Sequence, residues 1–103
     1  MIVVDPPRWP GGGRLWSHLV SDVSYAELHA FAELLGAPPR GFDRDHYDLP
    51  AQLYPVALWL GARPVSSREI VVRLRRAGLR RRQRIRSLEP AEPGRDAASS
   101  ARP

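Results

Sequence analysis

Short apolar runs in the first part of the chain have the pattern of β-strands. Ile2–Val4 is a β-branched run that ends at Asp5 before two prolines, which predicts a first strand. Trp16–Val20 predicts a second strand, in which alternate residues share one face. Residues 6–13, which lie between them, contain three prolines and three glycines. We therefore expect a loop there.

Three later segments carry apolar residues at helical spacing instead. Residues 25–35 and 67–77 each follow a serine with a glutamate three positions later, and each precedes a glycine, so both are predicted helices. Residues 50–60 predict a third helix. Pro55 requires that this helix either begins near Tyr54 or is kinked, because a proline inside a helix removes a backbone hydrogen bond.

The order of these segments favours an α/β or α+β layer over a helical bundle, with two to four strands and about three helices. A short extended piece is expected around residues 62–65. We expect residues 1–86 to form one globular domain whose basic last helix resumes from Arg80. Residues 87–103 are rich in Pro, Glu, Ala, Ser and Arg, and this composition predicts a disordered tail.

Length and composition narrow the class of protein. A chain of 103 residues has room for one hydrophobic core. The absence of cysteine excludes disulfides, thiolate metal sites and a catalytic thiol. No apolar run approaches the roughly 20 residues that span a bilayer, and no secretory signal is evident. We therefore expect a cytoplasmic protein with no membrane partner.

Positive charge is concentrated in one segment. Residues 1–67 hold five arginines and seven acidic residues, residues 68–88 hold nine arginines and one glutamate, and residues 89–103 hold two arginines and three acidic residues. The net charges are therefore −2, +8 and −1. Such a run would attract phosphate backbones, although a solvated basic face explains it equally well. The nucleic-acid candidates are Arg73, Arg75, Arg76, Arg80, Arg81, Arg82, Arg84 and Arg86.

Two candidate polar residues belong to the predicted strands. Asp5 ends the first strand, where functional groups of open α/β sheets often cluster. The alternative is an aspartate that bonds the turn before Pro6. His18 lies within the second strand and suits a general acid/base or a metal ligand. Its structural alternative is an imidazole bonded to a backbone carbonyl, and Asp22, just after the strand, is either a site or a cap residue.

A second polar group lies between the first two predicted helices. His46 and Asp48 alternate around Tyr47, so in an extended segment both project to one side. An adjacent imidazole and carboxylate suit proton transfer or binding of a divalent metal. Asp48 also stands where it could cap the next helix. His29 is more consistent with a boundary position on the first helix than with a ligand.

Several of these motifs recur together in a known family. They are Val3–Asp5, His18–Asp22, Glu27–His29, Asp45–Asp48 and Gly61–Ala62. In order and spacing they resemble a bacterial and phage family known as domain of unknown function 4031, over residues 2 to about 65. The resemblance implies no reaction. It implies that the site residues are Asp5, His18, Asp22, His46, Tyr47 and Asp48.

These observations support three hypotheses. The first is a polar pocket in which His and Asp side chains perform acid/base or metal-assisted chemistry on a small phosphate- or carbonyl-bearing molecule. The second is a nucleic-acid-associated module that uses the arginine-rich segment. The third is a homo-oligomer, because Trp9, Trp16 and Trp59 are many large aromatics for a small core. The sequence contains no Walker, GxGxxG, HExxH or GxSxG motif and specifies no cofactor.

Overall fold

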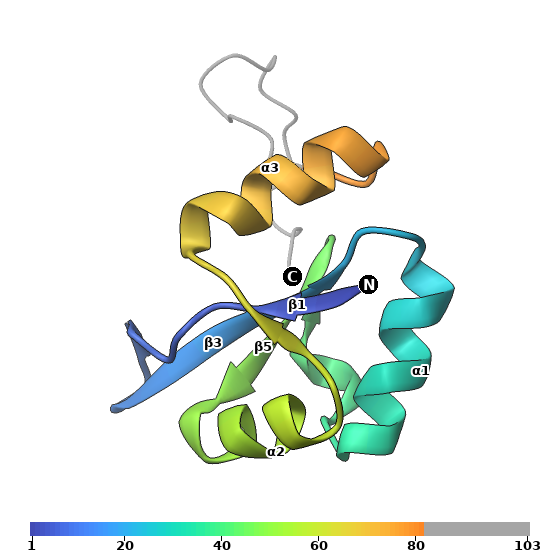
Figure 1. The fold of residues 1–103 in the computed structure, drawn as a ribbon. Coiled ribbons are helices and arrows are strands. Elements are labelled where there is room, and N and C mark those ends of the chain that lie inside the picture. Colours follow the sequence, from blue (N-terminus) through green and yellow to red (C-terminus); the bar gives the residue numbers. More distant parts are fainter. Residues whose placement is uncertain (82–103) are drawn as a thin grey trace, which may run out of the picture.

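The computed structural model describes residues 1–81, which form a six-stranded sheet with helices on both faces (Figure 1). The mixed α/β class is confirmed, but two to four strands were too few. The strands are β1 (Ile2–Val4), β2 (Trp9–Gly11), β3 (Arg14–Ser21), β4 (Phe42–Asp43), β5 (His46–Pro50) and β6 (Arg63–Pro64). The α-helices are α1 (Tyr25–Leu35), α2 (Tyr54–Trp59) and α3 (Ser67–Ala77).

β3 is the central strand of the sheet. It pairs antiparallel with β1, β2 and β5, and the strand order along the main path is β4-β5-β3-β1-β6. β4 extends the sheet beyond β5, and β6 lies parallel to β1 at the other edge. The extended piece expected around residues 62–65 is therefore β6. Because β3 has eight residues, it is long enough to pair with three other strands.

Residues 6–13, which were expected to form a loop, contain β2 and the turn that joins it to β3 in a hairpin. Gly12 and Gly13 both have positive φ angles, of 56° and 79°. A two-residue turn with positive φ at both positions matches the twist of paired strands, and only glycine adopts it without steric cost. The three glycines therefore build a tight β2–β3 hairpin, which extends β3 back to Arg14.

The two helices predicted from Ser/Gly signals have the predicted bounds. The Ser24 hydroxyl accepts a hydrogen bond from the Glu27 amide at the start of α1, and Ser66 does the same from the Glu69 amide at the start of α3. Each helix ends at a glycine in the left-handed conformation. Local capping chemistry thus fixes both helices independently of the sheet.

The segment predicted as a helix over 50–60 is divided. β5 continues to Pro50, a 3-10 turn covers Ala51–Leu53, and α2 begins at Tyr54 with Pro55 in its first turn. A proline is tolerated in that turn because its missing N–H would have no partner within the helix. Of the two alternatives for Pro55, a helix start near Tyr54 is confirmed.

The sequence predicts a basic helical segment over residues 68–86, interrupted at Gly78 and resuming from Arg80. α3 ends at Ala77 as predicted, but residues 79–81 are irregular, so the helix does not resume at Arg80. Gly78 in the left-handed conformation is the physical reason, because it turns the backbone out of the helix. The rest of that predicted helix and the predicted tail at 87–103 lie outside the described residues.

The helices cover the sheet unequally. α1 and α2 pack on one face and form the main apolar core, whereas α3 crosses the other face (Figure 1). Ile70 and Leu74 of α3 cover only Val3 and Val20 there. The same face continues along β3 and β5 beyond α3, and there it carries polar residues. None of the helices within residues 1–81 has the length and apolar composition needed to cross a membrane.

Candidate functional site

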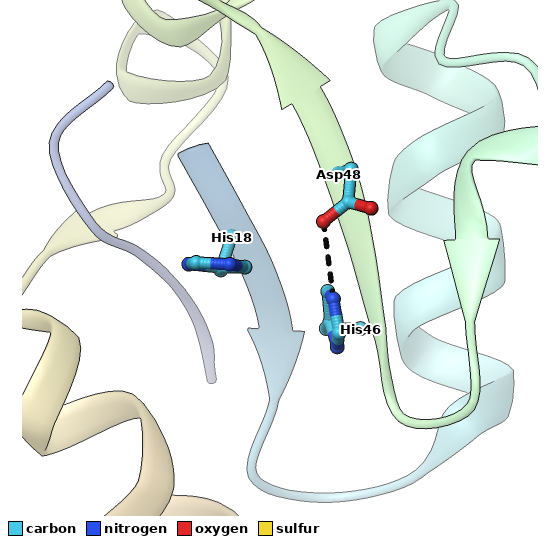
Figure 2. Close-up of side chains that lie close together, drawn as sticks. All are labelled: His18, His46 and Asp48. Atoms are coloured by element: carbon cyan, nitrogen blue, oxygen red, sulfur yellow. Dashed lines mark hydrogen bonds and ion pairs between the residues drawn. The ribbon is translucent and has the colours of Figure 1, made fainter. Parts of the chain in front are cut away.

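Three side chains capable of binding a metal or moving a proton meet beside α3 (Figure 2). His18 of β3 pairs directly with Asp48 of β5, and His46 lies two residues before Asp48 on the same strand. One ligand atom from each lies within 4.8 Å of the other two, and all three side chains are partly exposed. The predicted placement of His46 and Asp48 on one side of an extended segment is confirmed, and the strand pairing adds His18.

Asp5 fixes the orientation of His18. Its carboxylate is fully buried and accepts from His18 Nδ1 at 2.8 Å and from the His18 amide at 2.6 Å. The hydroxyl of Ser67, at the start of α3, also donates to it at 2.6 Å, and the indole N–H of Trp9 donates at 3.2 Å. With Nδ1 turned toward Asp5, the Nε2 atom of His18 is the nitrogen left for a ligand.

These contacts correct two sequence-based alternatives. Asp5 does not bond the turn before Pro6, because the donors that its carboxylate meets come from β2, β3 and α3. The Nδ1 partner of His18 is a carboxylate rather than a backbone carbonyl. Both differences arise from the β1–β3 pairing, which brings the end of β1 against the middle of β3.

Asp45 has the same role toward His46, and sequence reasoning missed it. Its carboxylate is 2% exposed and lies 2.8 Å from His46 Nδ1. The backbone N–H of Arg81 donates to it at 2.8 Å and the Arg80 guanidinium at 3.4 Å. Asp45 precedes β5 in the turn after Arg44, whose φ of 62° is left-handed, so strand alternation does not govern its direction.

The electrostatics of the site follow from these pairs. Burial tends to raise the pKa of Asp5 and of Asp45, but hydrogen bonds from the neighbouring histidines and amides outweigh it and lower the pKa of both. For His46, burial favours the neutral ring. The carboxylates of Asp45 and Asp48 prevail and raise the pKa of His46 to about 9. Without a cation, this ring is therefore charged at neutral pH and bridges the two carboxylates.

Asp48 lies in the cluster with His18 and His46 and is not a helix cap. It lies within β5, and its carboxylate contacts His46 Nε2 at 3.1 Å. The 3-10 turn that follows has Pro50 at its N-cap position and no side-chain cap. The predicted capping role is wrong because β5 extends two residues beyond Asp48 before the chain turns.

Asp22 lies outside this cluster. Its carboxylate contacts the Met1 amino group at 2.7 Å and the Arg73 guanidinium at 2.9 Å. The amino group and Arg73 lower the pKa of Asp22 against the effect of burial. Asp22 therefore joins the start of the chain, the end of β3 and the middle of α3, and within residues 1–81 its carboxylate makes no hydrogen bond or ion pair with His46 or Asp48.

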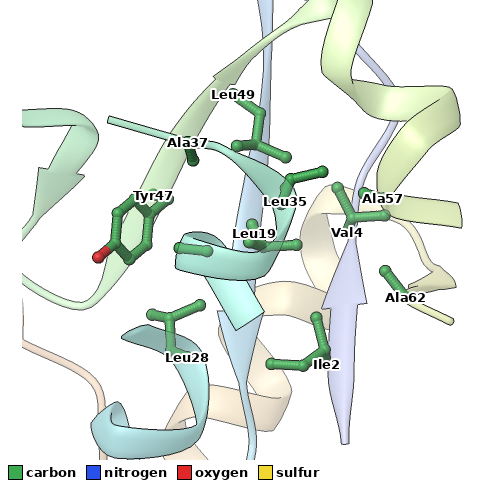
Figure 3. Close-up of a cluster of buried hydrophobic side chains, with 11 residues drawn as sticks. Ile2, Val4, Leu19, Leu28, Leu35, Ala37, Tyr47, Leu49, Ala57 and Ala62 are labelled. Carbon is green, nitrogen blue, oxygen red and sulfur yellow. The ribbon is translucent and has the colours of Figure 1, made fainter. Parts of the chain in front are cut away.

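Tyr47 points to the opposite face of the sheet, as the alternation predicts. It is buried in the core formed with α1 and α2, and burial raises its pKa (Figure 3). Its hydroxyl lies 2.7 Å from Nδ1 of His29 on the surface of α1. The structure thus places Tyr47 and His29 together on the far side of the sheet from His18.

Of the five candidate nucleic-acid arginines within residues 1–81, three make intramolecular contacts. Arg73 pairs with Asp22 and with a glutamate one turn earlier, Arg80 contacts Asp45, and the Arg81 guanidinium lies 4.0 Å from the ring centroid of Tyr25. The Tyr25 hydroxyl also donates to the carbonyl of residue 79. Arg75 and Arg76 are exposed on α3, whereas Arg82, Arg84 and Arg86 lie outside the described residues.

The chain belongs to the family described as "Protein of unknown function (DUF4031)", whose model matches residues 2–77. The sequence-based resemblance to this family is confirmed. The match extends beyond residue 65 and includes α3, so the helix that supplies Ser67 to Asp5 is part of the family region. Neither a curated protein nor a solved structure shows a significant match to the chain.

Proposed function

We propose that the chain binds a divalent metal ion through His18, His46 and Asp48, and uses it to act on a small molecule that carries a phosphate or carbonyl group. The observation that carries this proposal is the doubled histidine–aspartate arrangement. Each of the two histidines has its Nδ1 on a buried aspartate, and the cluster of ligand atoms lies within 4.8 Å.

Buried carboxylates of this kind are what metal-binding histidines commonly use. A carboxylate at one ring nitrogen fixes the ring orientation and makes the other nitrogen a better donor. Asp5 supports His18 and Asp45 supports His46 in this way. Both aspartates are themselves held by additional donors from the backbone or from other side chains, so the two rings have little freedom to turn.

The donor set indicates the class of metal. Two imidazoles and one carboxylate suit zinc, iron, cobalt or manganese better than calcium or magnesium, which prefer oxygen ligands. Three protein ligands leave coordination positions open for water and substrate. A metal at such a site polarises a carbonyl or phosphoryl oxygen and lowers the pKa of a bound water. The partial exposure of the three side chains gives a small molecule access.

Titration calorimetry with ZnCl2 and CoCl2 tests the metal site directly. We expect one ion per chain, with a visible Co2+ spectrum that reports nitrogen and oxygen ligands. A metal that binds only the folded protein at 100 times its Kd raises stability by about 2.7 kcal/mol, so the melting temperature should also increase. Failure of Zn2+, Co2+, Mn2+ and Ni2+ alike to bind would overturn the proposal.

Variants separate the ligands from their supporting residues. Loss of an outer carboxylate lowers metal affinity about 10- to 100-fold, which we expect for Asp5→Asn and Asp45→Asn. Asp48→Asn removes a ligand and should weaken binding at least as much. His29→Asn is the matched control, because His29 lies on α1 on the other face of the sheet. Equal effects of Asp48→Asn and His29→Asn would contradict the assignment.

Binding of nucleic acid is a second candidate function, and within residues 1–81 it would rest on fewer arginines than the sequence suggested. Arg75 and Arg76, in the last turn of α3, are exposed. Each phosphate contact to a single strand changes the slope of log K against log salt by about 0.7. Arg75→Gln with Arg76→Gln should therefore reduce the slope by about 1.4. Arg40→Gln, at an exposed arginine of the 3-10 turn Pro39–Gly41 outside the arginine-rich segment, should leave it unchanged. A salt-independent affinity would exclude this candidate.

A further inference from the structure

An indole ring is held beside the proposed metal ligands. Trp9 of β2 donates its N–H to Asp5 Oδ2 and to the Ser67 hydroxyl, each at 3.2 Å. Its ring lies 5.2 Å from the His18 ring, centroid to centroid, in an edge-to-face arrangement. Trp9 is nevertheless 44% exposed. The ring is therefore fixed in orientation by polar contacts while much of its apolar surface remains in solvent.

A second indole continues the same surface. Trp16 of β3 pairs in register with Trp9, and its N–H donates to the Gly11 carbonyl at 2.9 Å. Alternation places Arg14, Trp16 and His18 on one side of β3. The Arg14 guanidinium lies 5.7 Å from the Trp16 ring centroid. Successive positions on this side of the strand thus present a cation, an aromatic ring and a metal ligand.

Such a surface suits a ligand with a planar ring next to an anionic group. Ligand sites combine apolar and aromatic walls with a few placed polar groups, and an indole fixed before binding loses little entropy when a ring stacks on it. Positions two apart in a strand are separated by about 7 Å. A nucleotide likewise presents its base and its phosphate side by side.

We propose that the site takes a nucleotide unit, with its base stacked on Trp9 and its phosphate at the metal held by His18, His46 and Asp48. The inference rests on the proposed metal site and specifies its substrate class. Stacking requires an unpaired base, so the source is a free nucleotide or a single strand and not a duplex. Arg14, beyond the two indoles, is placed to contact a further phosphate.

Calorimetry of the Zn2+-loaded protein with three probes tests this inference. Adenosine 5′-monophosphate carries both groups, ribose 5-phosphate lacks the base and adenosine lacks the phosphate. We expect the monophosphate to bind most tightly. When an aromatic side chain that stacks on one base is replaced by alanine, the affinity for the nucleotide falls by about five- to 150-fold. Trp9→Ala should weaken binding of the monophosphate by that factor and leave ribose 5-phosphate unchanged.

Two further variants distinguish stacking from support of Asp5. Trp9→Phe keeps an aromatic face but removes the N–H, so it should restore most of the affinity for the monophosphate. Trp59→Ala is the matched control, because Trp59 is 84% exposed on α2, on the opposite face of the sheet. If Trp9→Ala weakens both phosphates equally, Trp9 only supports Asp5 and the inference is wrong.

The remaining outcomes separate this inference from the metal proposal. Equal affinity of the Zn2+-loaded protein for the monophosphate and ribose 5-phosphate would overturn the inference and leave the metal site standing. Base-dependent binding that Trp9→Ala removes, in a protein that binds no Zn2+, would support the aromatic subsite alone. A 12-nucleotide single strand that binds at least tenfold more tightly than the monophosphate identifies a single strand as the source. Equal affinity identifies the free nucleotide.

Discussion

The two faces of the sheet are made from alternate residues of the same strands, yet they differ in composition. Toward α1 and α2, the strands present Ile2, Val4, Leu19, Tyr47 and Leu49, which are buried in one apolar core (Figure 3). Toward α3, the same strands present two valines under the helix and then a histidine–aspartate cluster. One face therefore supplies most of the apolar burial, and the other keeps charged groups partly open to solvent.

The comparison shows how a small domain can hold buried charges. The aspartates at 5 and 45 are each removed from water, which is unfavourable unless donors surround them. The donors to Asp5 come from β2, β3 and α3, and the donors to Asp45 come from β5 and from residues 80 and 81 after α3. The strands β3 and β5 are held on their other side by the apolar core, whereas α3 packs on the polar side itself.

The largest expected effect is on the apolar face. Leu19→Ala removes a fully buried side chain from the centre of β3 and should lower the free energy of unfolding by about 2–5 kcal/mol. Leu15→Ala, on the same strand but 47% exposed, should change it by less than about 0.5 kcal/mol. Urea denaturation measures both. Similar losses in the two variants would contradict the assignment of the core.

The next effect tests whether the polar face also contributes to stability. Asp5→Asn replaces a buried carboxylate by an amide whose NH2 group cannot accept from its donors. Hydrogen bonds to a charged group contribute about 1.5–3 kcal/mol, so unfolding in urea should become easier by about that amount. Ser67→Ala, which removes one donor, should cost less. If Asp5→Asn is as stable as the parent chain, the polar face serves the site alone.

A smaller effect concerns the one polar side chain among residues 1–81 that is buried without a hydrogen bond. The Ser17 hydroxyl lies on the core face of β3 beside Leu19. A buried hydroxyl without a partner costs about 1–3 kcal/mol of desolvation. Ser17→Ala should therefore raise the free energy of unfolding by about 1 kcal/mol in urea titrations. A decrease would mean that the hydroxyl has a partner, such as a water molecule.

The smallest expected effect on stability depends on pH and comes from the ion pair between Asp22 and the Met1 amino group. The pKa of Asp22 is lowered from 3.8, chiefly by the Met1 amino group, so its contribution is complete above pH 3.8 and is lost as the pH falls further. The pKa of that amino group is raised from 8.0, chiefly by Asp22, so its contribution is lost as the pH rises above 8.0.

Asp22→Asn should therefore lower the melting temperature by a few degrees between pH 3.8 and 8.0, and by less outside that window. Thermal denaturation across this range measures the difference. Asp43→Asn is the control, since the Asp43 side chain is 45% exposed and, within residues 1–81, its one ion pair is with the neighbouring Arg44. A difference that does not depend on pH would show that Asp22 acts through packing and not through its charge.

Much of the local structure could be predicted from the sequence. The bounds of α1 and α3 follow from Ser24 and Ser66 at one end and from Gly36 and Gly78 at the other. The three glycines before Arg14 are also a sequence signal for the β2–β3 hairpin, because a tight two-residue turn with positive φ favours glycine. These features depend on a few consecutive residues, so the sequence is sufficient for them.

The candidate site was predictable only in its separate parts. Alternation placed His46 and Asp48 on one side and Tyr47 on the other, and the end of β1 indicated Asp5. The sequence did not indicate Asp45, because it precedes the strand in a turn with a left-handed residue. The family resemblance also implied that Asp22 belongs to the same site, whereas its carboxylate pairs with the Met1 amino group and with Arg73.

By itself, the sequence determined the bounds of α1 and α3 and which side of β5 His46, Tyr47 and Asp48 face, because these depend on hydrogen bonds and sterics within a few residues. Only the tertiary structure decided that His18 meets Asp48, that Asp45 supports His46 and that Trp9 lies against Asp5. Those contacts depend on strand register, which is set by pairing between residues far apart in the chain and by the burial of one whole face of the sheet.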